Sequence, residues 1–378
     1  MRVLHVMECT IGGTRRHLVD LALGQRAAGL EVDVVASTLR DPDFPPDLER
    51  LRDAGVRVHV LDMVRAPSPL LDLRHLAALK ALLRERRPEV MHAHSSKAGV
   101  LGRQASLSTG IGRRIYTPHT FAFLFRALFG PAKRAVYRGL ESHFAKHTDR
   151  FVAVAASEAE TWATSGVVPA ERVRVVPNGI DAAPFASAEP LERDELAPGL
   201  DPHAPLIAVV GLVYAAKGQD LLLRALTEPG LERAQVVFVG PGDSKPFQGQ
   251  ARELGVQERI RFVGARRDVP RVLRTVDALC LPSRWEGMPY VVLEAFAAGC
   301  PVVAHPVDGA RDAVVPGETG WLAEAIGPAP LAAALRSMLA ADRKEATAVT
   351  ERARACQEEH FSVDSMVAGM TRVYEEVL

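Results

Sequence analysis

The stretch from Pro282 to Val303, PSRWEGMPYVVLEAFAAGCPVV, contains two glutamates, Glu286 and Glu294, with seven residues between them. A Gly-Met-Pro turn follows the first glutamate, and the second lies in an apolar run with helical spacing. A turn leading into a helix directs backbone N–H groups and the positive end of the helix dipole at one point, which suits an anion such as a diphosphate. The alternative is a surface glutamate followed by a helix whose Glu294 is simply solvated.

The composition indicates a globular protein of two domains. A chain of 378 residues exceeds one ordinary core, and 48% apolar with 24% charged residues is typical of globular proteins. No apolar run reaches the roughly 18 residues of a membrane helix. The N-terminus reads as a strand that enters a glycine turn, and the four cysteines lack metal-type spacing. These features predict a protein of the reducing cytoplasm.

Both halves of the chain alternate strands and helices. Helices of about ten to fifteen residues between buried strands predict an α/β fold with a doubly wound parallel sheet in each half. The strands are expected at residues 2–7, 31–36, 56–61, 90–92, 115–118 and 151–155, and again at 206–211, 236–240, 261–264, 278–281 and 301–304.

Dense prolines interrupt this alternation near the middle of the chain. They predict a hinge or linker over residues 179–205, between a first domain at 1–178 and a second at 206–360. Residues 361–378 have the pattern of an amphipathic helix, which we expect to pack back on the first domain.

The net charge of zero conceals an asymmetry between the halves. Residues 1–150 carry 24 of the 46 basic and 15 of the 46 acidic residues, and the excess is densest from 113 to 150. Such a segment can contact an anionic inner-membrane surface or a lipid-phosphate acceptor, or be an amphipathic helix whose aromatics are core. Nucleic-acid binding is not expected, because the basic residues are confined to one segment. The interleaved aromatics are Phe121, Phe123, Phe125, Phe129, Tyr137 and Phe144.

Each half also begins its sheet with a strand and a turn suited to phosphate. The first turn contains Gly12 and Gly13, and the second contains Gly211 with Lys217 at the start of the next helix. Absent side chains let backbone N–H groups approach an anion, and a lysine neutralises a leaving diphosphate. Each feature alone also fits an ordinary turn. Neither turn has the spacing of a dinucleotide-binding loop or a P-loop, which argues against a nicotinamide dehydrogenase and an ATPase.

Two further patterns concern metal and acid–base chemistry. Asp41-Pro42-Asp43 is a D-x-D string in a Pro-rich loop without accompanying ligands, so no metal site is expected there. His92, His94 and His119 fall at the ends of first-half strands, where ligands bind in open α/β sheets. His119, within TPHTF, is best placed to face a cleft between domains, although a lone strand-end histidine is usually structural.

Several strings in order along nearly the whole chain resemble the retaining glycosyltransferases of family 4. These strings are IGGTRRHL, VMHAHSSKAGVLGR, YTPHTF, VVPNGID, VVGLVYAAKG and DVPRVLRTVDALCLPSRWEGMPYVVLEAFAAGCPVVA. The resemblance implies the GT-B architecture, in which two Rossmann-like domains with parallel sheets enclose an interdomain cleft. The second domain then holds a nucleotide-diphosphate sugar, and the first supplies the acceptor site.

The resemblance also implies residue roles, with His119, Lys217 and Glu286 as the catalytic set. Glu294 would bind the ribose, Glu286 with Gly287 and Met288 the sugar hydroxyls, and Lys217 the β-phosphate. His119 would lie near the transferred sugar. Gly12, Gly13 and Gly211 would approach the diphosphate, and Gly264 to Arg266 would lie near the base.

The implied reaction moves a hexose-type sugar, with retention, to a hydroxyl of a glycan, lipid-linked or natural-product acceptor in polysaccharide biosynthesis. UDP is favoured over GDP in the donor, which is a co-substrate, and neither a cofactor nor a metal is expected. A non-catalytic partner subunit that binds nucleotide sugar and a UDP-sugar 2-epimerase are the alternatives.

One departure from the family pattern concerns Leu212, where the family usually has an arginine on the diphosphate. The candidates to replace its charge are Arg15, Arg16, Arg266 and Arg284.

Overall fold

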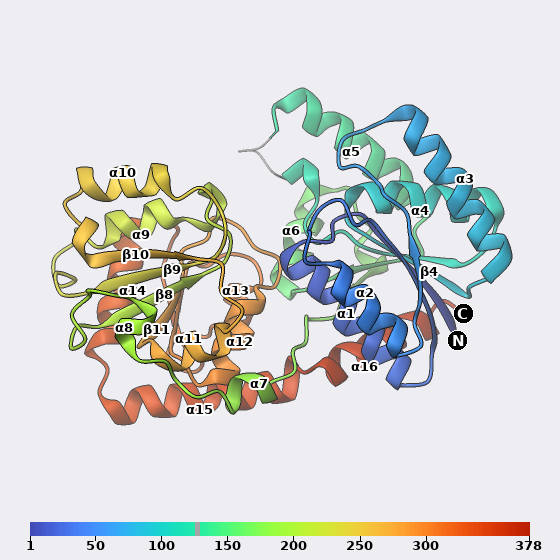
Figure 1. Cartoon of the computed structure of the whole chain (residues 1–378). Coiled ribbons are helices and arrows are strands. Elements are labelled where there is room, and N and C mark those ends of the chain that lie inside the picture. The colour runs from blue at the N-terminus through green and yellow to red at the C-terminus, as the bar shows by residue number, and fades with distance from the viewer. Residues whose placement is uncertain (125–128) are drawn as a thin grey trace. The chain divides into compact units, whose positions relative to one another are not determined.

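The computed structural model describes residues 1–124 and 129–378, and the chain divides into two compact units (Figure 1). The first unit comprises Met1–Gly179 together with Val363–Leu378, and the second comprises Ile180–Ser362. Each unit is built on one sheet of parallel strands flanked by helices. The predicted fold class, two Rossmann-like α/β units, is therefore confirmed.

The sheet of the first unit has seven strands in the order β3-β2-β1-β4-β5-β6-β7. The chain winds outward from β1 in one direction and then restarts at β4 in the other, so the order reverses between β1 and β4. The strands are β1 (Arg2–Met7), β2 (Glu31–Ala36), β3 (Arg57–Val60), β4 (Val90–His94), β5 (Arg113–Thr117), β6 (Arg150–Ala153) and β7 (Val173–Val175).

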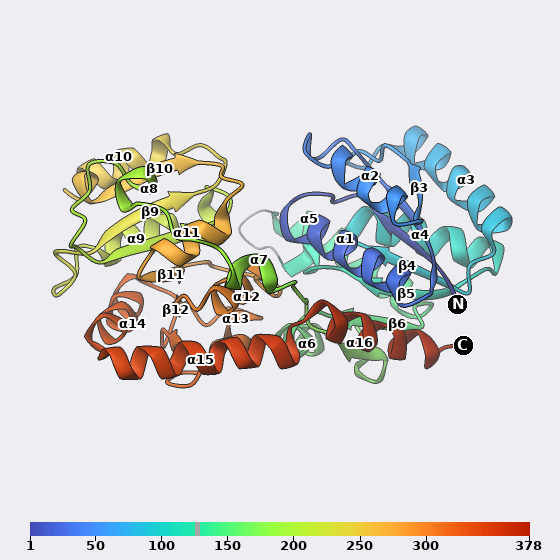
Figure 2. The same cartoon turned by 60° about the horizontal axis from the view of Figure 1, so that its bottom comes forward.

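Alternate strand residues of the first unit enter two separate cores. Val3 packs with α1, α2 and α16, whereas its neighbour Leu4 packs with helices of the opposite face. Helices α1 and α16 lie side by side, as Figures 1 and 2 both show. The C-terminal segment is therefore part of the first unit. The helices are α1 (Gly12–Ala27), α2 (Pro45–Asp53), α3 (Pro69–Arg86), α4 (Ser96–Thr109), α5 (Pro131–Ala145), α6 (Ala156–Ser165) and α16 (Val363–Glu375), with short 3-10 helices at Ala122–Leu124 and Ala170–Arg172.

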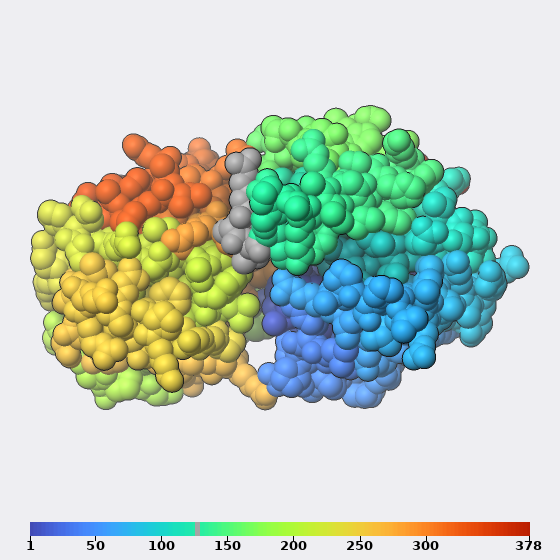
Figure 3. Space-filling view, turned by 90° about the horizontal axis from the view of Figure 1, so that it is seen from above, coloured from blue at the N-terminus to red at the C-terminus, as the bar shows by residue number. Residues whose placement is uncertain are grey.

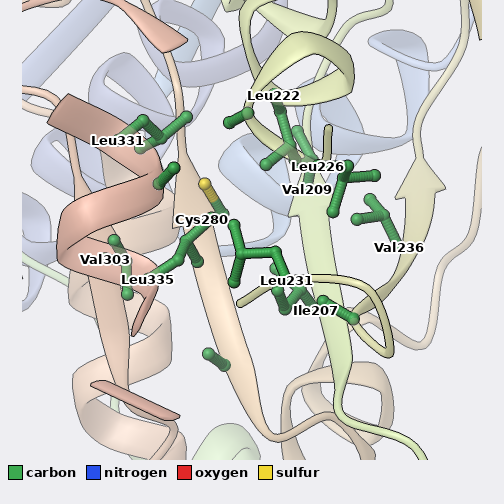
Figure 4. Close-up of a cluster of buried hydrophobic side chains, with 14 of the residues drawn as sticks. Ile207, Val209, Leu222, Leu226, Leu231, Val236, Cys280, Val303, Leu331 and Leu335 are labelled. Carbon is green, nitrogen blue, oxygen red and sulfur yellow. The ribbon is translucent and has the colours of Figure 1, made fainter. Parts of the chain in front are cut away.

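The sheet of the second unit has six strands in the order β10-β9-β8-β11-β12-β13, which reverses between β8 and β11. On one face, Ile207, Val209 and Cys280 pack against leucines of the covering helices, as Figure 4 shows. The strands are β8 (Leu206–Val210), β9 (Gln235–Val239), β10 (Ile260–Gly264), β11 (Ala278–Leu281), β12 (Val302–Ala304) and β13 (Trp321–Leu322).

Nine α-helices surround this second sheet within the described residues, and α12 packs against both α7 and α15. They are α7 (Ala183–Ala186), α8 (Arg193–Leu196), α9 (Gln219–Ala225), α10 (Lys245–Glu253), α11 (Val269–Thr275), α12 (Tyr290–Ala298), α13 (Ala310–Ala313), α14 (Pro328–Ala340) and α15 (Arg343–His360). Short 3-10 helices cover Ala215–Lys217 and Gln257–Arg259.

The structure differs from the expected linker at 179–205. Residues from Ile180 onward belong to the second unit, because Phe185, Leu191 and Leu196 are buried in it. The prolines of this segment therefore mark turns and the start of α7, not a solvated connection.

Among the helices of the two described ranges, none has both the length and the apolar character of a membrane span.

Candidate active site

The carboxyl ends of β8 and β11 lie side by side where the strand order of the second unit reverses. In open α/β sheets, ligands bind in the crevice outside the strands at this position. The turns after the two strands touch through their backbones, since the N–H of Arg284 donates to the carbonyl oxygen of Ala216 at 2.8 Å. Gly218 has a φ of +71°, and a Cβ there would lie 1.9 Å from the carbonyl oxygen of Pro282. Only glycine permits this contact.

Lys217 and Glu286 face each other across these turns. Lys217 Nζ lies 2.6 Å from Glu286 Oε1, and the Ser283 hydroxyl donates to the same oxygen at 2.6 Å. Burial acts to lower the pKa of Lys217, but the attraction and hydrogen bond of Glu286 outweigh it, so this pKa lies above its usual value. The site therefore holds a charged ammonium at neutral pH, with a carboxylate at its side.

Glu294 lies on α12, whose first residue, Tyr290, follows the Gly-Met-Pro turn. The side chain of Met288 is buried, and Glu294 is half-buried. The turn is fixed from the loop after β12, because a Cβ on Gly309 (φ +70°) would lie 1.8 Å from the carbonyl oxygen of Gly287. The predicted E-x7-E geometry, a turn followed by a helix start at the sheet edge, is therefore present.

His305, which has no distinguishing pattern in the sequence, positions the turn after β11. Its Nδ1 lies 2.8 Å from the carbonyl oxygen of Pro282, and a carbonyl only accepts, so Nδ1 carries the proton. Its Nε2 lies between the N–H of Gly327 at 3.3 Å and the carbonyl oxygen of Gly327 at 3.2 Å. Burial lowers the pKa of His305, in keeping with this neutral tautomer. The ring thereby holds the turn after β11 in place; its position directly after β12 was the only available signal.

Glycines lie at the carboxyl ends of β8, β9 and β10. A Cβ on Gly240 would lie 1.9 Å from the carbonyl oxygen of Gly211, and the Gly240 N–H donates to the carbonyl oxygen of Gly264 at 2.7 Å. Gly211 itself lies close to Lys217, with 3.9 Å between its Cβ position and Lys217 Cε. The structure thus brings Gly211, Lys217, Glu286, Gly287 and Met288 together, with Gly264 two strands away.

The four arginines considered as replacements for the charge missing at Leu212 all bind carboxylates. In the second unit, Arg284 pairs with Asp220 at 2.6 Å and Arg266 pairs with Asp268 at 2.6 Å. In the first unit, Arg15 bridges to Asp41 and Asp47 at 2.7 Å each, and Arg16 pairs with Asp20 at 3.2 Å. None of the four arginines therefore takes the place of Lys217, which pairs with Glu286. Asp41 of the D-x-D string forms an ion pair with Arg15.

The first unit presents Gly12, Gly13 and His119 at its own reversal point. Gly12 (φ +57°) opens α1 directly after the loop that follows β1, and a Cβ there would meet no atom within 4 Å. His119 follows β5 and has a φ of +52°, a strained value for a residue other than glycine. Such strain is typical of functional turns.

His119 is one member of a cluster of five histidines, of which His5 and His17 were not singled out from the sequence. The closest ring centroids, those of His92 and His94, are 4.0 Å apart. Burial lowers the pKa of each of the five imidazoles, to about 4 for His5 and His17. All five rings are therefore neutral at neutral pH.

The aromatic side chains at 113–150 lie mainly in the core. Phe121, Phe123 and Phe144 are buried, and Tyr137 packs against the hydrophobic cluster that contains Phe121 and Phe123. Phe125 lies outside the described residues. The alternative of a helix with core aromatics therefore describes most of this segment. Part of its surface lies on α5, where Lys133, Val136 and Leu140 are exposed. Figure 3 shows this part of the first unit at the surface.

Known families match most of the chain. Residues 12–179 match the family described as "Glycosyl transferase 4-like domain", and residues 204–341 match "Glycosyl transferases group 1". The D-inositol 3-phosphate glycosyltransferase of Actinosynnema mirum is 32% identical over 368 residues, covering 87% of this chain and 86% of that protein.

A second relative and a solved structure are also similar to this chain. The UDP-Gal:alpha-D-GlcNAc-diphosphoundecaprenol alpha-1,3-galactosyltransferase of Escherichia coli is 29% identical over 273 residues, 70% of each chain. The fold of Anabaena HepE, solved in complex with UDP-glucose, matches over 100% of both chains with a TM-score of 0.80 and 21% identity. The chain therefore belongs to the glycosyltransferases of family 4.

Proposed function

We propose that this protein transfers a hexose-type sugar from a UDP-sugar to a hydroxyl group, with retention and without a catalytic metal. The observation that carries the proposal is the contact of Lys217 with Glu286 at 2.6 Å, at the reversal point of the second sheet. A lysine for the diphosphate and a carboxylate for sugar hydroxyls are adjacent there, beside the start of α12. UDP is preferred to GDP because the Escherichia coli relative is named for UDP-Gal and the Anabaena structure holds UDP-glucose.

In the proposed mechanism, the bond between the anomeric carbon and the β-phosphate oxygen breaks as the acceptor hydroxyl bonds to the same face of the sugar. The leaving phosphate takes the acceptor's proton, so no protein nucleophile is required. Lys217 stabilises the charge that develops on this phosphate, and Glu286 orients the sugar through its hydroxyls. Because Glu286 also contacts Lys217, the two side chains share their hydrogen bonds with the donor once it is bound.

The remaining roles are also proposals. Glu294 binds the ribose, and the backbone of Gly287 and Met288 contacts the sugar. Gly211, Gly12 and Gly13 approach the diphosphate, His119 lies near the transferred sugar, and Gly264 with Arg266 lies near the base. Arg266 binds the Asp268 carboxylate, and its guanidinium is proposed to stack on the base or donate to it.

We further propose a lipid-linked glycan as acceptor and peripheral contact with the inner membrane surface. The Escherichia coli relative is named for a diphosphoundecaprenol acceptor, whereas the Actinosynnema relative is named for an inositol phosphate. The exposed apolar residues Val136 and Leu140 share α5 with the exposed Lys133. Apolar contact and attraction to anionic headgroups act together on such a helix.

Separate roles for the two glutamates predict different effects on UDP and on the UDP-sugar. Glu294→Ala is expected to weaken binding of UDP about 10- to 150-fold, since a charge-assisted hydrogen bond contributes about 1.5–3 kcal/mol. Glu286→Ala is expected to keep UDP affinity and to lose only the additional affinity for the sugar. Isothermal titration with UDP, GDP and UDP-hexoses measures both, with the exposed Glu318→Ala as control.

Several outcomes of these titrations, and of activity assays with the same donors, decide against the proposal. Wild-type UDP affinity in Glu294→Ala contradicts the ribose assignment, and a wild-type protein that binds neither UDP nor GDP contradicts donor binding itself. Donor binding without turnover, across a panel of acceptors, favours the non-catalytic partner subunit. Interconversion of a UDP-sugar in the absence of any acceptor favours the 2-epimerase.

A further inference from the structure

Three histidines of the first unit converge where the order of its sheet reverses. His17 lies in the second turn of α1, His94 ends β4, and His119 follows β5. The ring centroid of His17 lies 5.5 Å from that of His94 and 4.7 Å from that of His119. One ring nitrogen from each of the three residues lies within 4.8 Å of the other two.

The hydrogen bonds of Gln25 fix the tautomers of His5 and His94. Gln25 Nε2 donates to the hydroxyl of Tyr374 at 3.2 Å, so Gln25 Oε1 accepts from His5 Nε2 at 2.8 Å. A neutral His5 then has its lone pair on Nδ1, which accepts from His94 Nε2 at 3.0 Å. The Nδ1 atom of His94 is therefore left with a lone pair.

The tautomer of His17 is fixed by a hydrogen bond in the same way. Its Nδ1 donates to the amide oxygen of Asn178 at 2.9 Å, which leaves the lone pair on Nε2. Within the described residues, His94 Nδ1, His17 Nε2 and His119 Nε2 are buried nitrogens with no hydrogen-bond partner. Buried lone pairs without a partner are costly, and the two on His94 and His17 lie beside a third unpartnered nitrogen, His119 Nε2, which points to a ligand.

A second group of close histidines, His5, His92 and His94, does not have this property. His5 has partners on both nitrogens, and His92 binds Tyr374 at 2.7 Å and Thr117 at 2.9 Å. Binding an ion there would break these hydrogen bonds. Of these two groups, only that of His17, His94 and His119 has an unengaged buried nitrogen on every member.

We propose that His17, His94 and His119 form a site for a divalent transition-metal ion of the Zn²⁺ class. Three neutral imidazoles suit Zn²⁺, Co²⁺ or Ni²⁺, whereas Mg²⁺ and Ca²⁺ require oxygen ligands. Metal-bound histidines usually donate their other N–H to a fixed acceptor, as His17 does to Asn178 and His94 does to His5. Burial, which keeps these rings neutral, leaves their lone pairs available.

The ion has no part in the proposed transfer reaction. If His119 contacts the donor sugar, which rests on the proposed function, an ion bound to its Nε2 competes with that contact. The site then inhibits transfer when it is loaded. Its existence does not depend on that reaction, and its test requires neither donor nor turnover.

The test titrates metal-free protein with Co²⁺, followed by its visible spectrum, and with Zn²⁺ by calorimetry. The wild type is expected to bind about one equivalent with imidazole ligands, and X-ray absorption of the Zn²⁺ form should give Zn–N distances of about 2.0–2.1 Å. His17→Gln and His94→Gln are expected to weaken this binding at least about 100-fold. Asn178→Ala, which removes only the outer partner of His17, is expected to weaken it about 10- to 100-fold.

The exposed histidines His143 and His147 provide the matched control. Their rings lie 5.7 Å apart at the end of α5, so they can bind metal adventitiously. The double variant His143→Gln, His147→Gln should retain the wild-type site. No binding by the wild type, or binding that disappears in this control and persists in His17→Gln, overturns the proposal. If a cluster variant fails to fold, the X-ray absorption spectrum of the Zn²⁺-bound wild type still tests the proposal, because it shows whether imidazole nitrogens bind the ion.

Discussion

Replacing Lys217 by alanine is expected to slow sugar transfer about 10- to 150-fold. The ammonium loses one charge-assisted contact with the leaving diphosphate, which contributes about 1.5–3 kcal/mol, and each 1.36 kcal/mol is tenfold in rate. The raised pKa of Lys217 keeps it charged throughout the neutral range. Arg284 and Arg266 can replace the lost charge only by breaking their ion pairs with Asp220 and Asp268.

Steady-state kinetics with the preferred donor measure this effect. We expect kcat to fall together with kcat/KM, because the contact strengthens as charge develops on the phosphate. Lys245→Ala removes an exposed lysine of the same unit and serves as the matched control. A Lys217→Ala enzyme with the wild-type rate contradicts the assigned role, and equal losses in both variants would point to long-range electrostatics instead.

Acidification from pH 7.5 to 5.5 is expected to lower the free energy of unfolding of the first unit by several kcal/mol. Burial holds the pKa of His5 and His17 at about 4, and holds those of His92, His94 and His119 well below 6.5. Below pH 6.5 the unfolded chain binds protons that the folded unit does not, so stability falls as the pH falls. At pH 5.5, one unit below the usual pKa of 6.5, each histidine contributes on the order of 1 kcal/mol to this loss.

A loss of this size is comparable with the whole stability of a domain, about 5–15 kcal/mol. Native-state hydrogen exchange in the presence of a chelator measures it by region. The amides of β1 and β4 should lose protection between the two pH values, whereas those of β8 and β9 in the second unit should lose much less. Equal protection of β1 and β4 at both values would show that the histidines titrate normally.

Much of the fold was predictable because its strands are buried on both faces. The runs at Arg2–Met7, Glu31–Ala36 and Ala278–Leu281 have the bounds that their largely apolar character predicts. Two short strands, Val173–Val175 and Trp321–Leu322, were not predicted, because two or three residues give no periodic signal. The linker was misjudged because proline density says nothing about the burial of Phe185 and Leu196 around it.

The candidate site was predictable in its parts but not in its contacts. A turn, a helix start and a glycine are local features, so Glu286, Glu294 and Gly211 could be identified from the sequence. The ion pair of Lys217 with Glu286 joins two distant turns, and the histidine cluster joins segments from His5 to His119. Such pairings depend on strand order, which a sequence pattern does not specify.

The most direct test of the central claim is the configuration of the sugar that the enzyme releases. With UDP-α-hexoses and no acceptor, water takes the acceptor's place, and proton NMR records the anomer formed before mutarotation. The α anomer is expected to appear first, at a rate that falls in Lys217→Ala. A β anomer appearing first would contradict transfer on the same face and would require a different mechanism at this site.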